Sequence, residues 1–511
     1  MSFSRVRNHF TNWREWELNP IVVKELRQAV RSWTVTGMLL LLLTILLVAS
    51  LLFFGFQAAD ADPDVQLGTE MFSAFAVILA IASLVFIPLY LGIRVAAERP
   101  ENNPDLLYVS TLSPARIILG KFLCGAYMAV LFFSACMPFM AFTNLLRGVD
   151  LPTVFFILFY LFLTVCGVNM VAIFFGCIPA SRPFKVLFAI FGILVSLYMI
   201  GRVIAYAFMF MNFGIGTTMG GRDFWSTTLT AVAVEAAVTG LFYVMSVAMV
   251  SPPSSNRALP IRVYITVIWL LTVLVEVAWL AKHGRSDTFD AWTVPMFVLL
   301  LLSLLVVISN SDTLSNRVRR AIPRAPWKRF FAFLFFNGAA GGLVWIAAMM
   351  AATFLVSFRI FSLFPSYVAG SGDELLSLGA FAVYAFAYAL TALFIHRTFF
   401  RHRPAKIAGL LAVFITAACA LTPSIVLFFL NKLTMFSIER LELGNVFNIF
   451  VMRDDTRLVY HFYFALGWLA VIAALNVRWF FIQLRNFVPP PKNAPPVIAY
   501  GPGNPTSPAG G

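Results

Sequence analysis

Two charged side chains lie deep inside long apolar runs, where an ionisable group is costly and is most often functional. Arg202 lies about eight residues from the outer end of the run 186–210, and Glu235 about nine from that of 226–250. At ~1.5 Å of rise per helical residue, both reach similar depths of roughly 12–14 Å. We therefore expect Arg202 and Glu235 to form an ion pair. Such a pair either lines a gated polar pathway or only locks two helices together, and the sequence leaves both interpretations open.

The other residue types that support catalysis do not form a motif. No G-x-x-x-x-G-K-[ST] phosphate-binding loop occurs, because Gly120-Lys121 lacks the earlier glycine, where Ala115 stands, and is followed by Phe122. Neither G-x-S-x-G nor H-E-x-x-H occurs. The five cysteines lie in apolar runs without metal-ligand spacing: Cys124, Cys136, Cys166, Cys177 and Cys419. The sequence therefore predicts no enzyme activity, no metal and no cofactor on this chain.

The composition is that of a membrane protein. Of the 511 residues 60% are hydrophobic and 12% are charged, against roughly 25% charged residues in an ordinary globular domain. Apolar runs long enough to cross ~30 Å of hydrocarbon recur along the chain. The net charge of +14 then reflects basic residues that flank membrane spans and does not indicate a nucleic-acid partner.

The pattern predicts an all-α polytopic bundle in a lipid bilayer. We expect a segment 1–34 with an interfacial helix, a six-span domain 35–250, a Pro-rich linker 251–262, a second six-span domain 263–487, and a disordered Pro/Gly-rich tail 488–511. About twelve spans are predicted: 35–57, 71–93, 122–146, 153–177, 186–210, 226–250, 263–281, 293–309, 330–356, 378–396, 408–430 and 461–482.

The basic residues predict the orientation of the bundle. With the N-terminus inside, the inner segments hold 27 of the 37 Lys and Arg, the outer loops hold nine, and Arg202 lies in a span. This bias is a strong positive-inside signal. Both termini and the loop 98–121 are therefore predicted to be cytosolic.

An amphipathic helix is predicted before the first span. Asn19 is a suitable N-cap and Pro20 a suitable first helical residue. Apolar side chains from Val22 to Trp33 fall on one side, and basic ones fall on the other. We expect it to lie in the membrane interface, with these positions of interest: Asn19, Pro20, Lys24, Glu25, Leu26 and Arg27.

The polar loop 98–121 is too well organised for a plain connector. Asn103 and Pro104 form a cap-then-proline pair, and Ser113-Pro114 repeats it at the start of a helix that runs into the third span. Asp105 suits the positive end of the first helix. The candidate residues of this loop are Glu98, Arg99, Asn103, Pro104, Asp105, Leu106, Leu107, Val109, Ser113, Arg116 and Lys121.

The second half lacks a comparable loop. The inner loop 310–329 is basic and looks poorly capped, although Thr313-Leu314-Ser315 stands where the first half has Thr111-Leu112-Ser113, which hints at a degenerate repeat. Gly338 and Gly342 form G-x-x-x-G, whose small residues let helices approach closely. We expect them to form a packing face of the ninth span, within the chain or between chains.

Two segments resemble the ABC-2 type transporter permeases, the membrane-spanning subunits of ABC transporters. Residues 19–27, Asn-Pro-Ile-Val-Val-Lys-Glu-Leu-Arg, look like the family's interfacial helix. Glu98-Arg99, Asp105-Leu106-Leu107 and Thr111-Leu112-Ser113-Pro114 through Gly120-Lys121 look like its loop between spans two and three. Ser110-Thr111 stands where the family usually has Thr-Pro, and Asn102-Asn103 where it has Gly-Thr.

The resemblance, which covers about residues 15–250, implies a permease subunit, expected to be an exporter, of a bacterial inner membrane. A separate ATPase chain, which would bind the ATP and magnesium, is expected to dock on the loop 98–121. Leu106, Leu107 and Val109 are the expected apolar contacts, and Arg116 and Lys121 are expected to set the depth of the third span. A homodimer or a second permease subunit is a further possible partner.

Two alternatives stay open. A secondary transporter is expected to show broken helices and several charges at the midplane, of which the sequence offers only Arg202 and Glu235. A non-transporting scaffold or assembly factor would use the small-residue face and the tail but would not need a capped loop.

Overall fold

The computed structural model describes ten stretches of the chain, which form helices, turns and connecting loops without a β-strand. Eleven helices within these stretches are long and apolar enough to cross a membrane, and a shorter apolar helix spans Trp292–Ile308. The protein is therefore an all-helical integral membrane protein, while the number of twelve spans stays a prediction. The described residues are 20–57, 67–98, 113–146, 149–179, 181–213, 221–283, 289–363, 372–429, 442–450 and 455–490.

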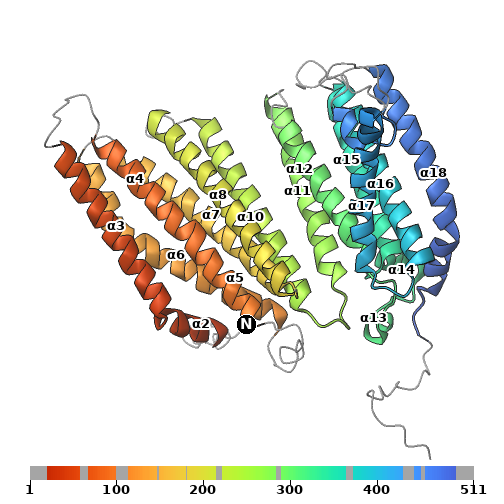
Figure 1. Cartoon of the computed structure of the whole chain (residues 1–511), viewed down its shortest axis with the longest axis horizontal. Coiled ribbons are helices and arrows are strands. Elements are labelled where there is room, and N and C mark those ends of the chain that lie inside the picture. Colours follow the sequence, from red (N-terminus) through yellow and green to blue (C-terminus); the bar gives the residue numbers. More distant parts are fainter. Residues whose placement is uncertain are drawn as a thin grey trace, which may run out of the picture. The chain divides into compact units, whose positions relative to one another are not determined.

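The chain divides into two compact units, Met1–Pro252 and Pro253–Gly511 (Figure 1). The boundary lies inside the predicted linker 251–262, although helix α11 already begins at Ala258 and shortens that linker. Of the predicted tail 488–511, the structure describes only the residues up to 490.

The first unit holds a short leading helix and long apolar helices. Hydrophobic runs form helices here because hydrocarbon offers no hydrogen-bond partners, so each backbone group must be satisfied within its own segment. The bounds are α2 Pro20–Val30, α3 Trp33–Gln57, α4 Leu67–Ile81, a π-helical turn Ala82–Phe86, α5 Ile87–Ala97, α6 Pro114–Leu145, α7 Leu151–Cys177, α8 Arg182–Phe213 and α10 Arg222–Val250.

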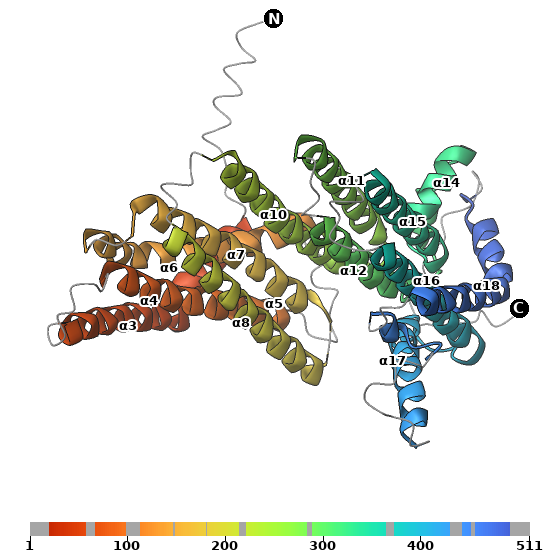
Figure 2. The same cartoon turned by 90° about the horizontal axis from the view of Figure 1, so that it is seen from above.

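Helix α7 forms the centre of the first unit. It packs against α5, α6, α8 and α10, and the views of Figures 1 and 2 both place it among them. The core is built from buried side chains such as Phe72, Phe75, Phe132 and Leu161 on α4, α6 and α7. By contrast α3, α8 and α10 leave many large apolar side chains exposed, as expected of helices that face lipid or further protein.

A π-helical turn interrupts the second span just before Pro88. Residues 82–86 form this turn between α4 and α5, and Ala82, Ser83 and Leu84 are buried. Proline lacks the backbone N–H that would continue the α-helical ladder, which accounts for an irregular turn at this point. Such π-helical turns often lie beside functional sites.

The second unit is organised around α16. This helix packs against α12, α15, α17 and α18, and its buried Tyr384 and Tyr388 contact the core around Val446 and Leu458. The bounds are α11 Ala258–His283, α12 Phe289–Ile308, α13 Asn316–Arg320, α14 Pro326–Phe335, α15 Ala339–Leu363, α16 Gly372–Phe399, α17 Lys406–Phe429, a 3-10 turn Val446–Phe450 and α18 Asp455–Asn486.

The predicted ninth span, 330–356, is wrong as one continuous helix. The structure ends α14 at Phe335 and starts α15 at Ala339, with Phe336, Asn337 and Gly338 between them. Gly338 has φ of 134°, a backbone conformation that glycine adopts readily and other residues rarely adopt. We call residues 336–338 the helix break.

Candidate functional site

Four charged side chains meet where the predicted loop 98–121 leaves and re-enters the bundle. Lys121 on α6 donates to Glu25 Oε1 on α2 at 3.2 Å and to Glu98 Oε2, at the end of α5, at 2.5 Å. Arg94 Nη2 on α5 lies 3.5 Å from Glu25 Oε2. We call Glu25, Arg94, Glu98 and Lys121 the loop-end cluster.

Solvent exposure differs between the members of the loop-end cluster. The side chains of Glu25 and Lys121 are 7% and 8% exposed, whereas that of Glu98 is 39% exposed. A buried ion pair is not strongly stabilising in itself, but losing one partner leaves an uncompensated buried charge. The pair Glu25–Lys121 therefore fixes α2 against α6, and Glu98 forms the rim.

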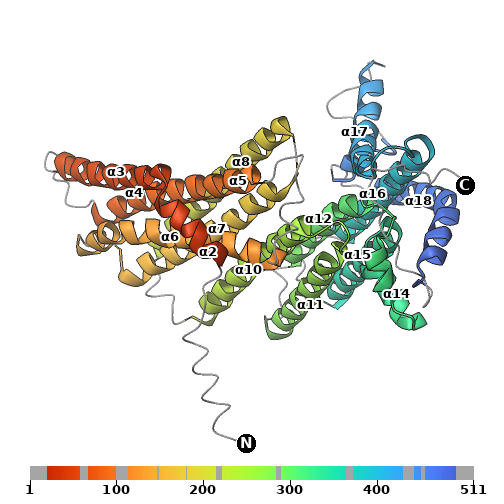
Figure 3. The same cartoon turned by 90° about the horizontal axis from the view of Figure 1, so that it is seen from below.

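Neutral groups complete the cluster. Arg94 donates to Tyr90 Oη at 2.7 Å and also to Gln28 on α2, and its guanidinium lies 5.5 Å from the centre of the Tyr90 ring. Since Gln28 and Glu25 lie on the same helix, these side chains join α2 to α5 and to α6. Figure 3 shows α2 lying across the bundle helices at this end.

Two further bonds attach other helices to the same end. Lys185, in the first turns of α8, donates to the carbonyl of Ala96 at 3.2 Å, near the end of α5. Tyr243 on α10 donates to the carbonyl of Ala115 at 3.1 Å, in the first turn of α6. The helix ends on both sides of residues 99–112 are thus joined to α2, α8 and α10.

The predicted loop residues are only partly described. Ser113 caps α6 as expected, since its Oγ accepts from the backbone N–H of Arg116 at 3.4 Å, and α6 runs unbroken to Leu145. Arg116 is exposed, but Lys121 is buried. Lys121 therefore binds side chains of the protein itself, and the expectation that the two residues set the depth of the third span stays a prediction. The predicted residues outside the described part are Arg99, Asn103, Pro104, Asp105, Leu106, Leu107 and Val109.

Helix α2 exists but buries a different face from the one expected. Val22, Glu25 and Ala29 are buried, whereas Val30 is 60% exposed. Trp33, which was expected on this helix, is the first residue of α3. The spacing of three and four residues puts Glu25 on the inner face, which faces α6. Lys24 and Arg27 are exposed and Leu26 is half-buried, while Asn19 and the side chain of Pro20 lie outside the described part.

The expected contact between Arg202 and Glu235 is present. Arg202 Nη2 on α8 lies 3.2 Å from Glu235 Oε2 on α10, with side chains 36% and 18% exposed. The carboxylate rests against Gly167 of α7, where an added Cβ would lie 2.3 Å from Glu235 Oε1. The pair therefore joins α8 and α10 beside α7, and glycine at 167 makes room for the carboxylate.

In the second unit, the side chain of Arg262 on α11 contacts the C-terminal end of α14 at the helix break. Its guanidinium donates to the carbonyls of Leu334 at 2.7 Å, Phe336 at 2.8 Å and Gly338 at 3.1 Å, and the residue is only 2% exposed. The last carbonyls of a helix carry partial negative charge and lack helical partners. Arg262 therefore serves as a built-in cation at the break.

Asp312 occupies the opposite side of the helix break. Its Oδ1 accepts from the backbone N–H of Ala339 at 2.9 Å, at the start of α15, and its Oδ2 accepts from Trp479 Nε1 at 3.2 Å. Burial raises the pKa of Asp312, against the lowering effects of these bonds and of Arg397. Both helix ends at the break are thus neutralised by side chains of the protein itself.

Gly338 does not belong to a helical packing face, which corrects the predicted G-x-x-x-G motif. It lies in the helix break, ahead of α15. Gly342 does mark a close approach, because an added Cβ would lie 2.5 Å from Arg262 Nη2 and 2.6 Å from Val307 Cγ1. The small residue is needed to admit the arginine and α12.

The loop 310–329 is better capped than predicted. Ser315 Oγ accepts from the backbone N–H of Val318 at 3.3 Å and starts α13, as Ser113 starts α6. The resemblance ends there, because α13 has five residues and does not continue into a span.

Sequence reasoning did not assign roles to Arg94, Gln28, Arg262 or Asp312. Arg94 and Arg262 have the pattern of ordinary flanking basic residues. Gln28, which Arg94 contacts, and the three carbonyls that Arg262 contacts lie 66 to 76 positions away from them. An Asn-Gly pair at 337–338, a frequent turn signal, could have indicated the break.

The described residues contain no group of three or more His, Cys, Asp or Glu side chains that could hold a metal ion. No family model, no curated protein and no solved structure matches the chain.

Proposed function

We propose that this protein is the membrane-spanning permease subunit of an ATP-driven exporter, with the ATPase on a separate chain that docks on the loop 98–121. The observation that carries the proposal is the position of Lys121, which contacts both Glu98 at the end of α5 and Glu25 on α2. A loop that transmits force to the bundle must be attached to helix ends that are held in place. The ion pairs of Lys121 hold the ends of α5 and α6 in this way.

The route of the force follows from the same contacts. Ser113 begins α6, which continues without interruption through the predicted third span. A displacement of the loop by the ATPase would move α6 directly. It would move α2 through Glu25, α8 through Lys185, and α10 through Tyr243. The apolar side chains of Leu106, Leu107 and Val109 are the proposed docking contacts.

A second candidate, a secondary transporter, is favoured by the helix break. Broken helices whose ends coordinate ions or substrates are typical of that class. Here Arg262 and Asp312 already bind backbone groups at the two helix ends. Fewer of these backbone groups therefore remain to coordinate a transported ion. We therefore rank the ATP-driven permease first and the scaffold or assembly factor last.

The proposal is tested by purifying the tagged full chain from native membranes, both unaltered and with Leu106→Asp and Leu107→Asp together. We expect an ATPase with a phosphate-binding loop to co-purify with the unaltered chain, and its ATP hydrolysis to be lost with the double variant. Val488→Asp is the control, because Val488 is an exposed apolar residue outside the loop, 49% exposed.

Equal ATPase recovery with the double variant would overturn the docking site. Failure to recover any ATPase with the unaltered chain, while an ion gradient alone drives uptake or release in vesicles, would instead support the secondary transporter.

A further inference from the structure

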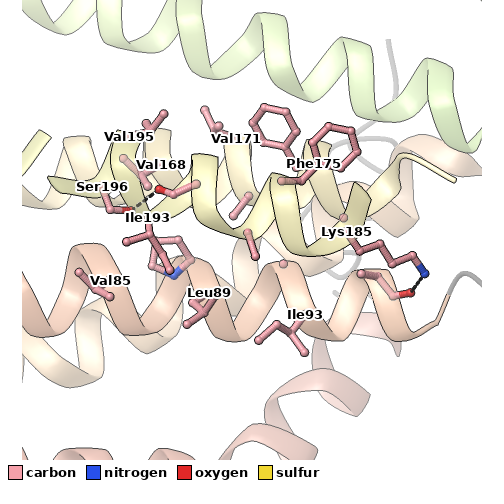
Figure 4. A pocket seen from close by; sticks show the side chains of 18 of the residues that line it. Val85, Leu89, Ile93, Val168, Val171, Phe175, Lys185, Ile193, Val195 and Ser196 are labelled. Carbon is pink, nitrogen blue, oxygen red and sulfur yellow. Dashed lines mark hydrogen bonds between the residues drawn. The ribbon is translucent and has the colours of Figure 1, made fainter. Parts of the chain in front are cut away.

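A long pocket lies on the side of the first unit, between α5, α7 and α8. Its volume is about 480 Å³, within the ~300–1,000 Å³ range of ligand sites. Figure 4 shows Leu89 and Ile93 of α5 along one wall, together with Val85 of the π-helical turn that precedes it. Val168, Val171 and Phe175 of α7 line another wall, and α8 lies on the third side. We call this pocket the α5–α8 groove.

The groove is open because small residues line much of it. Gly92 and Gly176 let α5 and α7 approach closely, since a Cβ at Gly176 would lie 2.8 Å from the carbonyl of Gly92. On α8, an added Cβ at Gly192 would meet no atom within 4 Å. In the described part of the chain, no side chain therefore fills the groove at Gly192.

Charge is confined to one end. Apart from Lys185 and Ser196, the lining side chains are apolar, and Ser196 donates to the carbonyl of Gly192 at 3.0 Å. Figure 4 shows Lys185 at one end and Ser196 at the other. Lys185 lies beside Ala96, at the end of α5 that leads to the loop. The basic residues predict that this end faces the cytosol.

The length of the groove matches one leaflet. From Val85 to Ala97 the lining helix advances roughly 18 Å at ~1.5 Å per residue, and half of a ~30 Å hydrocarbon core is ~15 Å. An apolar channel of this length, with a cation at its membrane-surface end, is complementary to an acyl chain that ends in an anionic headgroup.

We propose that the α5–α8 groove binds an anionic phospholipid of the cytosolic leaflet, with one acyl chain along Gly192 and its phosphate at Lys185. Polybasic and single basic positions near that leaflet attract anionic lipids, and Lys donates to phosphate as a point charge. Because Lys185 also holds the carbonyl of Ala96, the bound lipid would brace the end of α5. Lipid binding in the α5–α8 groove does not require an ATPase partner.

The test is native mass spectrometry of the purified full chain, titrated with a phosphatidylglycerol or with a phosphatidylcholine of the same acyl chains. We expect one phosphatidylglycerol to bind at least several-fold more tightly than phosphatidylcholine. Lys185→Gln should remove this headgroup preference, and Gly192→Leu should remove the tight binding by filling the groove.

Two matched controls separate the groove from general lipid contact. Gly201→Leu changes a second glycine of α8 whose added Cβ also meets nothing within 4 Å but which lies outside the groove. Lys24→Gln removes an exposed charge of α2. Both should bind phosphatidylglycerol like the unaltered chain.

Equal loss of binding in the Gly192→Leu and Gly201→Leu variants would overturn the groove as the site. Equal affinity of the unaltered chain for the two lipids would overturn the role of Lys185. A thermal unfolding scan of each variant shows that it is folded, and Gly192→Ala provides a smaller substitution if Gly192→Leu fails to fold.

Discussion

Lys121 Nζ lies 3.2 Å from Glu25 Oε1, although 96 positions separate the two residues in the chain. The two side chains are 8% and 7% exposed, so the charges are held away from water. This contact ties a helix that lies across the bundle to the helix that follows the polar loop, and it is the joint on which the proposed transmission of force depends.

Removing Lys121 should destabilise the first unit strongly. Lys121→Met leaves the carboxylate of Glu25 buried, with Arg94 at 3.5 Å as its remaining cation among the described residues. Breaking a buried pair typically costs about 3–5 kcal/mol. The free energy of unfolding, measured by titration with a denaturing detergent, should fall by about this amount.

Lys24→Met is the control for that experiment, because it removes an exposed lysine from the neighbouring position to Glu25 and should change the free energy by less than about 0.5 kcal/mol. Exchange of the pair, Glu25→Lys with Lys121→Glu, should recover part of the loss. A Lys121→Met chain as stable as the Lys24→Met chain would show that the pair contributes nothing.

Gly167 should be required for the pair Arg202–Glu235. Gly167→Ala puts a Cβ about where Glu235 Oε1 lies, at 2.3 Å, and such overpacking usually costs about 1–3 kcal/mol. In a Glu235→Ala background the same substitution should cost little, so the coupling energy of the double-mutant cycle should be large.

Gly201→Ala is a matched control, since its added Cβ meets nothing within 4 Å. If Gly167→Ala costs the same with and without Glu235, the carboxylate does not rest on that glycine. Exchanging the charges of Arg202 and Glu235 tests the pair itself: an exchange tolerated no better than either single neutralisation would contradict the pairing.

Much of the fold is readable from hydropathy. A span must satisfy its own backbone, so its apolar run reports its position directly, and α7 at Leu151–Cys177 lies within two residues of the predicted span 153–177. The depth argument likewise anticipated the contact of Arg202 with Glu235, because helical rise converts sequence position into depth.

The wrong predictions for the ninth span and for the buried face of α2 have a common cause. In both places, side chains from distant parts of the chain determine the local structure. Hydropathy continues across residues 336–338, and the break there is stabilised by Arg262, more than 70 positions away. Similarly, the amphipathic pattern of α2 did not indicate that Glu25 faces inward, because the compensating cation Lys121 lies beyond two spans. The burial of a charged side chain such as Glu25 can be predicted only when the residue that pairs with it is known.

Arg262 should be essential for the helix break. Arg262→Met would remove the donor from the carbonyls of Leu334 and Phe336, while that of Gly338 keeps the backbone N–H of Gly342. Each unsatisfied buried group costs about 1–3 kcal/mol. The second unit should unfold at much lower detergent concentration. Arg262→Lys, whose side chain has a single nitrogen, should recover only part of the lost stability. Equal stability of the Lys and Arg forms would show that the several donors of the guanidinium are not required at the break.

The carboxyl group of Asp312 should make the second unit more stable at low pH. Its pKa is raised by burial, so the folded chain holds this proton more tightly than the unfolded chain, whose aspartate has a pKa of about 3.9. The stabilisation is therefore fully present below the unfolded value, and it is lost as the pH rises through the raised folded-state pKa.

Asp312→Asn removes this titration and keeps an oxygen that can accept from Ala339. The difference in free energy of unfolding, unaltered chain minus Asp312→Asn, should fall between about pH 4 and the folded-state pKa, and then level off. Trp479→Phe removes a donor that lowers the pKa of Asp312, so the fall should extend to higher pH. A difference that stays flat or rises over this range would show that burial is not the dominant influence on Asp312.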